Sequence, residues 1–272
     1  MLGLTLGLRS SFKAGAYSTF AVREFHIQYL GEARPGAPLM IKSAITDLRQ
    51  TDMDAVHIMY HAGGRPACCV TERLDHISTR TRRAFRWPSR VKKAAKAFTI
   101  ERPQIARSRG IDLSARPSGM TMKQAKAAGM TLLGKGVFSE SDTDIFGRVT
   151  AQAILGRVTQ TVGQFSAAWP EMHSEDFTSG ESHIHGALLE ARVILGPPPV
   201  AGDGYHFYSA IAGATPNVRT LVHKLYNAVT GELIASKQGV GCLMDLQARK
   251  HVKTPADTVE ALNAAAIEGL SV

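Results

Sequence analysis

The stretch SESDTDIFGRVTAQAILGRVTQTVGQF, residues 139–165, predicts an acidic turn followed by an amphipathic helix. Gly147 offers a turn position free of Cβ constraints, and Thr150 can cap the helix because its hydroxyl accepts a hydrogen bond from a backbone N–H. Asp144 precedes this helix N-terminus, where unsatisfied N–H groups can polarise a carbonyl group. The apolar residues of the helix share one face: Ala151, Ile154, Leu155, Val158, Val162 and Phe165.

Two glycines, Gly156 and Gly163, lie inside the predicted helix. Each costs ~1 kcal/mol relative to alanine in a helix interior. We therefore expect a neighbouring element to pack closely against both positions.

The composition is ordinary for a soluble globular protein, with 44% hydrophobic and 20% charged residues among 272. The length allows one large domain or two modest ones, and the sequence has no apolar run of about 18 residues that would predict a transmembrane helix. Cys68 and Cys69 are adjacent and Cys242 is distant, which favours reduced thiols and a cytoplasmic location. His183 and His185 have no cysteine or acidic partners at metal-ligand spacing, so no metal site is predicted.

The net charge of +9 is concentrated between Arg80 and Lys126, where fourteen lysines and arginines accompany two acids. Such a segment can bind nucleic acid, a membrane surface or the phosphates of a ligand. Aromatic residues are sparse there, which argues against a stacking platform for single-stranded nucleic acid. We interpret the segment as a solvated linker, and we expect neither nucleic acid nor a membrane as a partner.

The chain repeats itself at an offset of 166 residues, which becomes 167 after one inserted residue. This near-constant register predicts two copies of one structural unit. The matching pairs are Glu24 and Glu190, Gly36 and Gly202, Ser43-Ala44-Ile45 and Ser209-Ala210-Ile211, Val56-His57 and Val222-His223, Tyr60 and Tyr226, Gly64 and Gly231, Arg82 and Arg249, and Pro88 and Pro255.

The second copy reads as a short strand, a long helix and four further strands, which is an α+β arrangement of a sheet around one helix. Turn residues separate the strands, as in NAVTGE, residues 227–232, which suits a hairpin. The predicted strands are Gly134–Ser139, Ala187–Leu195, Tyr205–Ala212, Arg219–Tyr226 and Leu233–Leu246.

The first copy has no counterpart of residues 134–166, and so lacks the opening strand, the acid and most of the helix. Either the true start lies upstream, or this half has lost the element and residues 1–14 are a helix tail. The N-terminal residues 1–20 contain no acid, and this composition also permits a transit peptide. A bare sheet face is unfavourable, so residues 1–14 or a partner subunit should cover it.

The sequence thus predicts four parts, with a connector that can hold short helices at 90–98 and 121–128. They are residues 1–88 as the first, N-terminally incomplete unit, 89–130 as a basic connector, 131–255 as the second, complete unit, and 256–272 as a C-terminal helix.

Two copies of an antiparallel sheet around a central helix, with an acid-bearing turn before the helix, resemble the double (tandem) hotdog acyl-CoA thioesterases. The local sequence is most similar to their 4-hydroxybenzoyl-CoA thioesterase-like branch. The signature of that branch is Asp, two residues, Gly-His and, two further on, Asn; here the stretch reads Asp144-Ile-Phe-Gly147-Arg148-Val-Thr150. Asp and Gly match, whereas Arg148 replaces His and Thr150 replaces Asn.

This resemblance implies a thioester hydrolase, an acyl-CoA thioesterase, in which Asp144 acts as general base on water or as nucleophile. It implies that backbone N–H groups around Thr150, Ala151 and Gln152 hold the thioester oxygen. The substrate-binding residues that follow from it are Gly147, Arg148, Gln152 and Glu190. Coenzyme A would be part of the substrate, so no separate cofactor is implied, and we also expect a homo-oligomer. Without the resemblance, Asp144 reads as a solvated turn residue.

His57 and His223 recur in both copies beside apolar neighbours, which indicates packing in the core rather than chemistry. Ser182 and Ser209 lack a nucleophile-elbow context, so a serine triad is not predicted. Glu190 lies in a predicted strand, where hydrogen bonding within the sheet competes with a role in substrate binding.

Two alternative functions remain open. A non-catalytic acyl-CoA-binding protein of the same fold is compatible with the changes at Arg148 and Thr150 and with the missing acid in the first copy. An enoyl-CoA hydratase would need an Asp and His pair on one loop, and no such pair follows Asp144.

Overall fold

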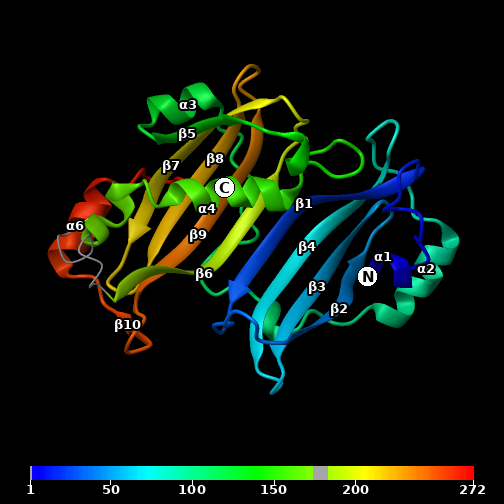
Figure 1. The fold of residues 1–272 in the computed structure, drawn as a ribbon, viewed down its shortest axis with the longest axis horizontal. Coiled ribbons are helices and arrows are strands. Elements are labelled where there is room, and N and C mark those ends of the chain that lie inside the picture. The colour runs from blue at the N-terminus through cyan, green and yellow to red at the C-terminus, as the bar shows by residue number, and fades with distance from the viewer. Residues whose placement is uncertain (1, 174–182) are drawn as a thin grey trace. The chain divides into compact units, whose positions relative to one another are not determined.

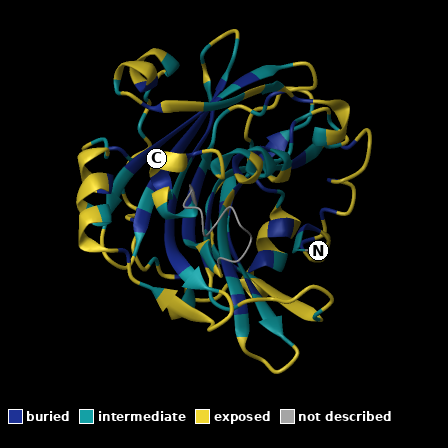
Figure 2. Ribbon diagram, turned by 60° about the vertical axis from the view of Figure 1, so that its left-hand side comes forward, coloured by how far each residue is buried: buried dark blue, intermediate teal, exposed yellow. Residues whose placement is uncertain are grey.

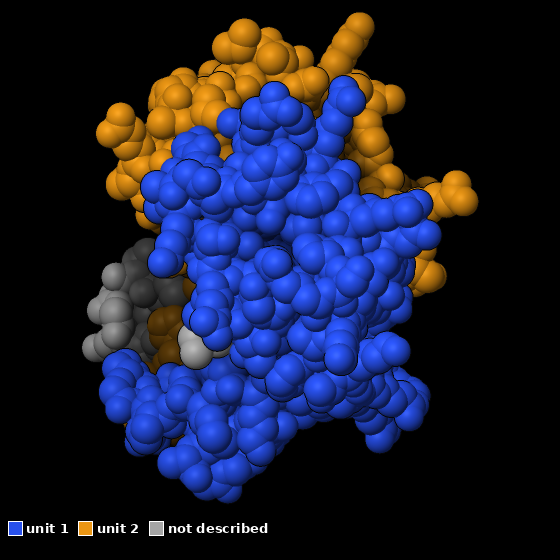
Figure 3. All heavy atoms as spheres, turned by 90° about the vertical axis from the view of Figure 1, so that its right-hand side faces the viewer, with its two compact units in different colours: residues 1–109, 144–147 blue, residues 110–143, 148–272 orange. Residues whose placement is uncertain are grey.

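The computed structural model describes residues 2–173 and 183–272, and these fall into two units (Figure 3). The first unit comprises residues 1–109 and 144–147, and the second comprises 110–143 and 148–272. The basic segment predicted as a connector is therefore not a separate part, because it divides between the two units after Arg109.

Four strands form the antiparallel sheet of the first unit, in the order β2-β3-β4-β1 (Figure 1). Their bounds are Ser18–Tyr29 for β1, Leu39–Leu48 for β2, Asp52–His61 for β3 and Pro66–Ser78 for β4. Gly64, in the hairpin between β3 and β4, has a φ of +80°, which glycine adopts without a Cβ penalty. Among the described residues of this unit there is neither a fifth strand nor a long helix, as the incomplete first copy predicts.

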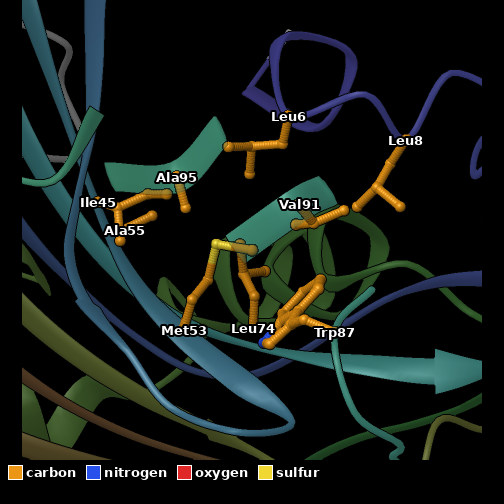
Figure 4. Packing of buried hydrophobic residues seen from close by; sticks show 9 residues of the cluster. All are labelled: Leu6, Leu8, Ile45, Met53, Ala55, Leu74, Trp87, Val91 and Ala95. Atoms are coloured by element: carbon orange, nitrogen blue, oxygen red, sulfur yellow. The ribbon is translucent and has the colours of Figure 1, made fainter. Parts of the chain in front are cut away.

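The N-terminal residues cover a face of this sheet (Figure 4). Leu6, which follows the short helix α1 (Leu2–Thr5), packs in one cluster with Met53 of β3 and with Val91 of α2 (Ser89–Ala95). Leu6 and Val91 are almost completely buried, whereas the lysines and the arginine of α2 are exposed. The interpretation of the basic segment as a solvated linker is therefore wrong for α2, whose apolar side chains belong to the core.

The sheet of the second unit has the strand order β6-β9-β8-β7-β5, with β10 paired to β9 (Figure 1). All the pairings described within it are antiparallel. The strands are Thr131–Val137 for β5, Ile184–Leu195 for β6, Gly204–Ala214 for β7, Arg219–Asn227 for β8, Leu233–Asp245 for β9 and Lys250–Val252 for β10.

Helix α4, Ala151–Val162, lies across one face of this sheet (Figure 1). Its buried residues are Ile154 and Val158, and they pack in one cluster with Phe207 of β7 and Leu225 of β8. Both lie on the apolar face that the sequence predicts. Strand β8 is buried along nearly its whole length, which requires cover on its other face as well (Figure 2).

That other face is covered by helix α3, Met122–Ala127, and by C-terminal residues. Ala125 of α3 and Leu270 pack in one cluster with Tyr208 and Tyr226. Successive side chains of a strand point to opposite faces, so Tyr208 lies on the far side of the sheet from the cluster beneath α4. The C-terminal part of the basic segment is thus also built into a core.

The terminal helix is shorter than predicted, since α6 spans Ala256–Ala264. Its Asn263 side chain bonds the backbone N–H and C=O of Ala214, at the end of β7, at 2.8 and 3.0 Å. Short 3-10 helices occupy Lys96–Phe98, Gln104–Ala106, Glu140–Asp142, Ser166–Ala168 and Pro170–His173.

The two sheets share their irregularities at positions 166 residues apart. The register shifts between Val22 and Glu24 in β1, and correspondingly between Leu188 and Glu190 in β6. The other matched shifts are Ile45/Asp47 with Ile211/Gly213 and Met59/Tyr60 with Leu225/Tyr226. The described non-glycine residues with positive φ are also matched, at the offset of 167 that follows the inserted residue: Arg82 at 57° and Arg249 at 55°. Bulges bend a strand at one defined point, so their repetition is evidence for a common structural plan.

The two glycines of the central helix are not explained by close packing. A Cβ placed on Gly156 or Gly163 would meet no atom within 4 Å. The expectation of a tightly packed neighbour is therefore wrong for both positions, and Gly163 is instead the C-cap of α4.

Candidate active site

Helix α4 begins at a capped end whose first backbone donors are available. Thr150 is the N-cap, and its hydroxyl accepts a hydrogen bond from the N–H of Ala153 at 3.1 Å. Within the described part of the chain, the N–H groups of Ala151 and Gln152 have no hydrogen-bond partner. With the positive end of the helix dipole, these donors can hold a carbonyl or anionic oxygen.

Asp142 fixes the loop that leads to this helix. Its Oδ2 accepts hydrogen bonds from the N–H and the hydroxyl of Ser139, at 2.8 and 2.9 Å, and pairs with Arg157 of α4 at 2.7 Å. The Ser139 N–H, and then the Ser139 hydroxyl and the charge of Arg157, lower the pKa of Asp142. The carboxylate therefore stays ionised as a tether between loop and helix.

Asp144 lies in a turn that belongs to the first unit, whereas α4 belongs to the second. Its Oδ1 accepts a hydrogen bond from the N–H of Phe146 at 2.9 Å, and its carbonyl accepts one from the N–H of Gly147 at 2.9 Å. Gly147 has a φ of +71° and closes this Asx turn. Asp144 is half-buried. The geometry gives it a role in the turn, and its catalytic role stays a prediction.

Glu190 is almost completely buried in β6 and binds a segment of the chain rather than an open site. Its Oε2 accepts a hydrogen bond from the N–H of Gly110 at 2.8 Å. Two residues further along, Arg192 donates to the carbonyls of Asp112 and Ala115 at 3.0 and 2.8 Å. This pattern favours hydrogen bonding that holds residues 110–115 on the sheet, and leaves the substrate-binding role of Glu190 as a prediction.

The other predicted site residues differ in their exposure to solvent. Gly147 and Gln152 are exposed, and Arg148 is half-buried. The predicted residues Arg148 to Gln152 lie together at the start of α4, whereas Glu190 lies in the sheet.

A cavity of about 350 Å³ lies in the second unit, lined by the C-terminal half of α4 and by the sheet. Trp169 forms part of its wall, and Cβ atoms on Gly186 and Gly241 would lie 3.4 and 3.1 Å from the indole ring. Arg219 lies over the same ring, 4.7 Å from its centroid. Sequence reasoning missed this wall; the available signal was a cluster of strand glycines, which marks a close approach.

The polar groups on the sheet side of this cavity are His223 and Lys237. Burial lowers the pKa of Lys237 to about 8, and burial together with Lys237 lowers the pKa of His223 well below its usual value. His223 is therefore neutral at neutral pH, with its Nδ1 2.6 Å from the Ser209 hydroxyl. The prediction that His223 is a core residue is confirmed, since it is 3% exposed.

His57 differs from its counterpart. Its side chain is 24% exposed and lines a cavity of about 530 Å³ in the first unit. The prediction that His57 is a core residue is wrong, because no long helix among the described residues of the first unit covers this part of its sheet. Ser182, for which no triad was predicted, lies outside the described residues.

No three His, Cys, Asp or Glu side chains in residues 2–173 and 183–272 are grouped so that they could hold a metal ion. None of the described helices combines the length and the apolar character needed to cross a membrane.

Part of the chain matches a known protein family. Residues 4–95 match the model of the Thioesterase-like superfamily. No curated protein matches the chain significantly.

Three solved thioesterase structures are similar over most of the chain. The 12:0-ACP thioesterase from Umbellularia californica has a TM-score of 0.64 and 14% identity, covering 87% of this chain and 76% of that one. The putative oleoyl thioesterase from Lactobacillus plantarum has a TM-score of 0.61 and 12% identity, with 88% and 82% covered. An acyl-ACP thioesterase from Bacteroides thetaiotaomicron has a TM-score of 0.56 and 10% identity, with 83% and 77% covered. The chain therefore has a hotdog-like thioesterase fold of antiparallel sheet and few helices.

Proposed function

We propose that this protein is an acyl thioester hydrolase built as a tandem hotdog. The observation that carries the proposal is the match of residues 4–95 to the Thioesterase-like superfamily. The likeness of the whole fold to thioesterases agrees with it. The matched register shifts of the two sheets support the tandem arrangement.

In the proposed mechanism, Asp144 removes a proton from the attacking water or itself attacks the thioester carbon. The N–H groups of Ala151 and Gln152 hold the carbonyl oxygen as negative charge develops on it. Thr150 keeps these donors in place through its bond to Ala153. Arg148 supplies a positive charge for the phosphate of the thiol carrier.

The substrate is a thioester whose carrier is part of the substrate, so the mechanism needs no separate cofactor. The sequence resemblance points to coenzyme A as carrier. Two of the similar structures are acyl-ACP thioesterases by their titles, so acyl carrier protein is the other carrier to test.

The test is thiol release from acyl-CoA and acyl-ACP panels by wild type and by Asp144→Asn. The asparagine keeps the size of the side chain and can still accept from Phe146, but it has no basic carboxylate. We expect kcat to fall ~10²–10⁴-fold, with little change in KM or melting temperature. Equal rates for the two proteins would exclude Asp144 as the base.

A second function, binding of acyl thioesters without hydrolysis, has one observation in its favour. The Asp144 carboxylate already accepts a hydrogen bond within its own turn, which is sufficient reason for an aspartate there. Saturable binding of an acyl-CoA, with no thiol released from any substrate by wild type, would support this function over catalysis.

A further inference from the structure

The first unit holds a cavity that the proposed mechanism does not use. Its volume is about 530 Å³, and all four strands and the N-terminal segment contribute to its wall. Most of the wall is apolar, with Leu6, Phe12, Phe20 and Leu74 among its residues. Its polar part consists of Ser43, His57 and Glu72. An apolar pocket of this size with a few convergent polar groups is typical of small-molecule sites.

Ser43, His57 and Glu72 form a continuous hydrogen-bonded chain across β2, β3 and β4. The Ser43 Oγ lies 2.7 Å from His57 Nδ1, and Glu72 Oε1 lies 2.9 Å from His57 Nε2. Ser43 and His57 are cross-strand partners in the ladder, so the sheet itself sets their separation. Hydroxyl, imidazole and carboxylate in this order form the arrangement that activates a nucleophile.

The partners also determine where the protons are. An ionised carboxylate can only accept, so in the neutral imidazole the proton lies on Nε2 and points to Glu72. Nδ1 is then a bare acceptor, and the Ser43 hydroxyl must donate to it. The lone pairs of the Ser43 oxygen remain available, and Ser43 is exposed on the cavity wall.

The second unit has an equivalent serine and histidine that can be compared with Ser43 and His57. Ser209 and His223 repeat the hydroxyl–imidazole pair at 2.6 Å. However, Gly239 takes the place of Glu72 in the second sheet. Glu72 pairs with Ala55, and Gly239 pairs with Leu221, which is the equivalent of Ala55 at the 166-residue offset. Ser209 is also completely buried. The second unit therefore lacks both the carboxylate and the access that the first unit has.

We propose that Ser43, His57 and Glu72 form a serine-nucleophile site that accepts acyl groups with apolar chains from esters or thioesters. The Ser43 oxygen bonds to the acyl carbon while its proton passes to His57 Nδ1. The bond to the leaving alcohol or thiol breaks, and the imidazolium returns the proton to that group. Water then cleaves the acyl-serine ester by the same route in reverse, which restores the hydroxyl and releases the acid.

The cavity favours an acyl chain because its wall is apolar, and Glu72 holds the imidazole in the orientation that takes up the serine proton. Backbone N–H groups of β3 are used in its ladders with β2 and β4, which limits the donors available to an oxyanion. Covalent capture is therefore a more direct measure of this site than turnover. The site does not depend on Asp144.

The experiment treats the full chain with a long-chain alkyl fluorophosphonate, which phosphonylates an activated serine with loss of fluoride. The modified residue is identified by peptide mass spectrometry, and labelling rates are measured for wild type, Ser43→Ala, His57→Gln, Glu72→Gln and Ser209→Ala. We expect one adduct, on Ser43, that is absent in Ser43→Ala. Its rate should fall about 10²–10⁴-fold in His57→Gln, fall in Glu72→Gln and remain unchanged in Ser209→Ala.

Circular dichroism and melting temperatures show that each variant is folded. The proposal is overturned by folded wild type without an adduct on Ser43, by equal labelling of wild type and His57→Gln, or by an adduct on Ser209 instead. Labelling of Ser43 in Asp144→Asn separates the two proposals, because it should persist there even if the thiol release that depends on Asp144 is lost.

Discussion

Two carboxylates, Asp142 and Asp144, lie two residues apart and have different partners. Asp142 is tied to Arg157 and Ser139, so its charge holds the loop against α4. The Asp144 carboxylate accepts the N–H of Phe146 within its own turn. The difference allows substitutions that remove either charge to be interpreted separately.

Asp142→Asn should lower stability more than activity. The change removes the ion pair with Arg157. The side chains of Asp142 and Arg157 are 13% and 23% exposed. A hydrogen bond to a charged group contributes ~1.5–3 kcal/mol to stability. Solvent screens part of this interaction, so we expect the free energy of unfolding to fall by ~1–2 kcal/mol. Urea unfolding measures this loss, and thiol release per folded molecule should stay within a few-fold of wild type. A fall as large as that expected for Asp144→Asn would assign the chemistry to Asp142 instead.

Lys224 should make stability depend on alkaline pH. It is fully buried in β8, where its Nζ donates to the Ser236 hydroxyl and to the carbonyl of Ser271 at 3.0 and 3.1 Å. Burial lowers its pKa from 10.5 to about 8. Between these two values the unfolded chain binds the proton and the folded chain does not, so stability rises with pH across that window.

Lys224 alone contributes a slope of up to ~1.4 kcal/mol per pH unit to the free energy of unfolding. Below pH 8 the buried amine is charged, and its full destabilising effect is present. Urea unfolding of wild type and Lys224→Met across the window measures it. The methionine variant should lose the part of this rise that comes from Lys224 and keep the part that comes from Lys237, whose pKa burial also lowers to about 8. An identical slope in the two proteins would show that Lys224 is not the group that titrates.

At the scale of single elements, α4 contains an interior glycine that lowers helix stability and that close packing does not require. Gly156 lies in the helix interior, and a Cβ there would meet open space. Gly156→Ala should therefore raise the free energy of unfolding by ~0.5–1 kcal/mol, because alanine loses less backbone entropy in a helix. Denaturant unfolding with an unchanged m-value would confirm the gain.

Gly196, which follows β6, is the matched control for this substitution. A Cβ there would overlap the backbone oxygen of Leu233, so the backbone itself would have to move. Gly196→Ala should destabilise the protein, by ~1–3 kcal/mol as for other overpacked sites. If both glycines respond alike to alanine, local helix entropy is not the cause of the Gly156 effect.

At the scale of the whole molecule, each unit has hydrophobic clusters of its own, and Leu6 joins the N-terminal segment to the first of them. Leu6→Ala should cost ~2–5 kcal/mol, as expected for a buried leucine. Hydrogen exchange should then speed up in β1 to β4 and change little in β6 to β9.

Ile154→Ala, in the core beneath α4, is the reciprocal control and should speed up exchange in β7 to β9. Faster exchange throughout the chain in both variants would mean that the units unfold as one, and would contradict separate cores. The comparison is read by mass spectrometry on peptides from each sheet.

Much of the fold was predictable because its signals are local or repeated. Alternating apolar residues and turn residues located β7, β8 and β9 to within a few residues, and Thr150 was correctly predicted as the cap of α4. A cap and a strand depend on residues close in the chain, so composition and spacing are sufficient. The 166-residue repeat predicted two copies of one structural unit, and the matched register shifts and left-handed residues of the structure agree with it.

The sequence by itself was sufficient to predict the strands of the second unit, the capped start of α4 and the turn that holds Asp144. Only the tertiary structure decided which side chains meet: it buried His223 but left His57 in a cavity, and it joined His57 to Ser43 and Glu72 from neighbouring strands. The physical reason is that burial and hydrogen bonding depend on what lies above a strand and beside it. Equivalent histidines in two copies read alike in sequence, and they differ because a long helix covers one sheet and a short N-terminal segment covers the other.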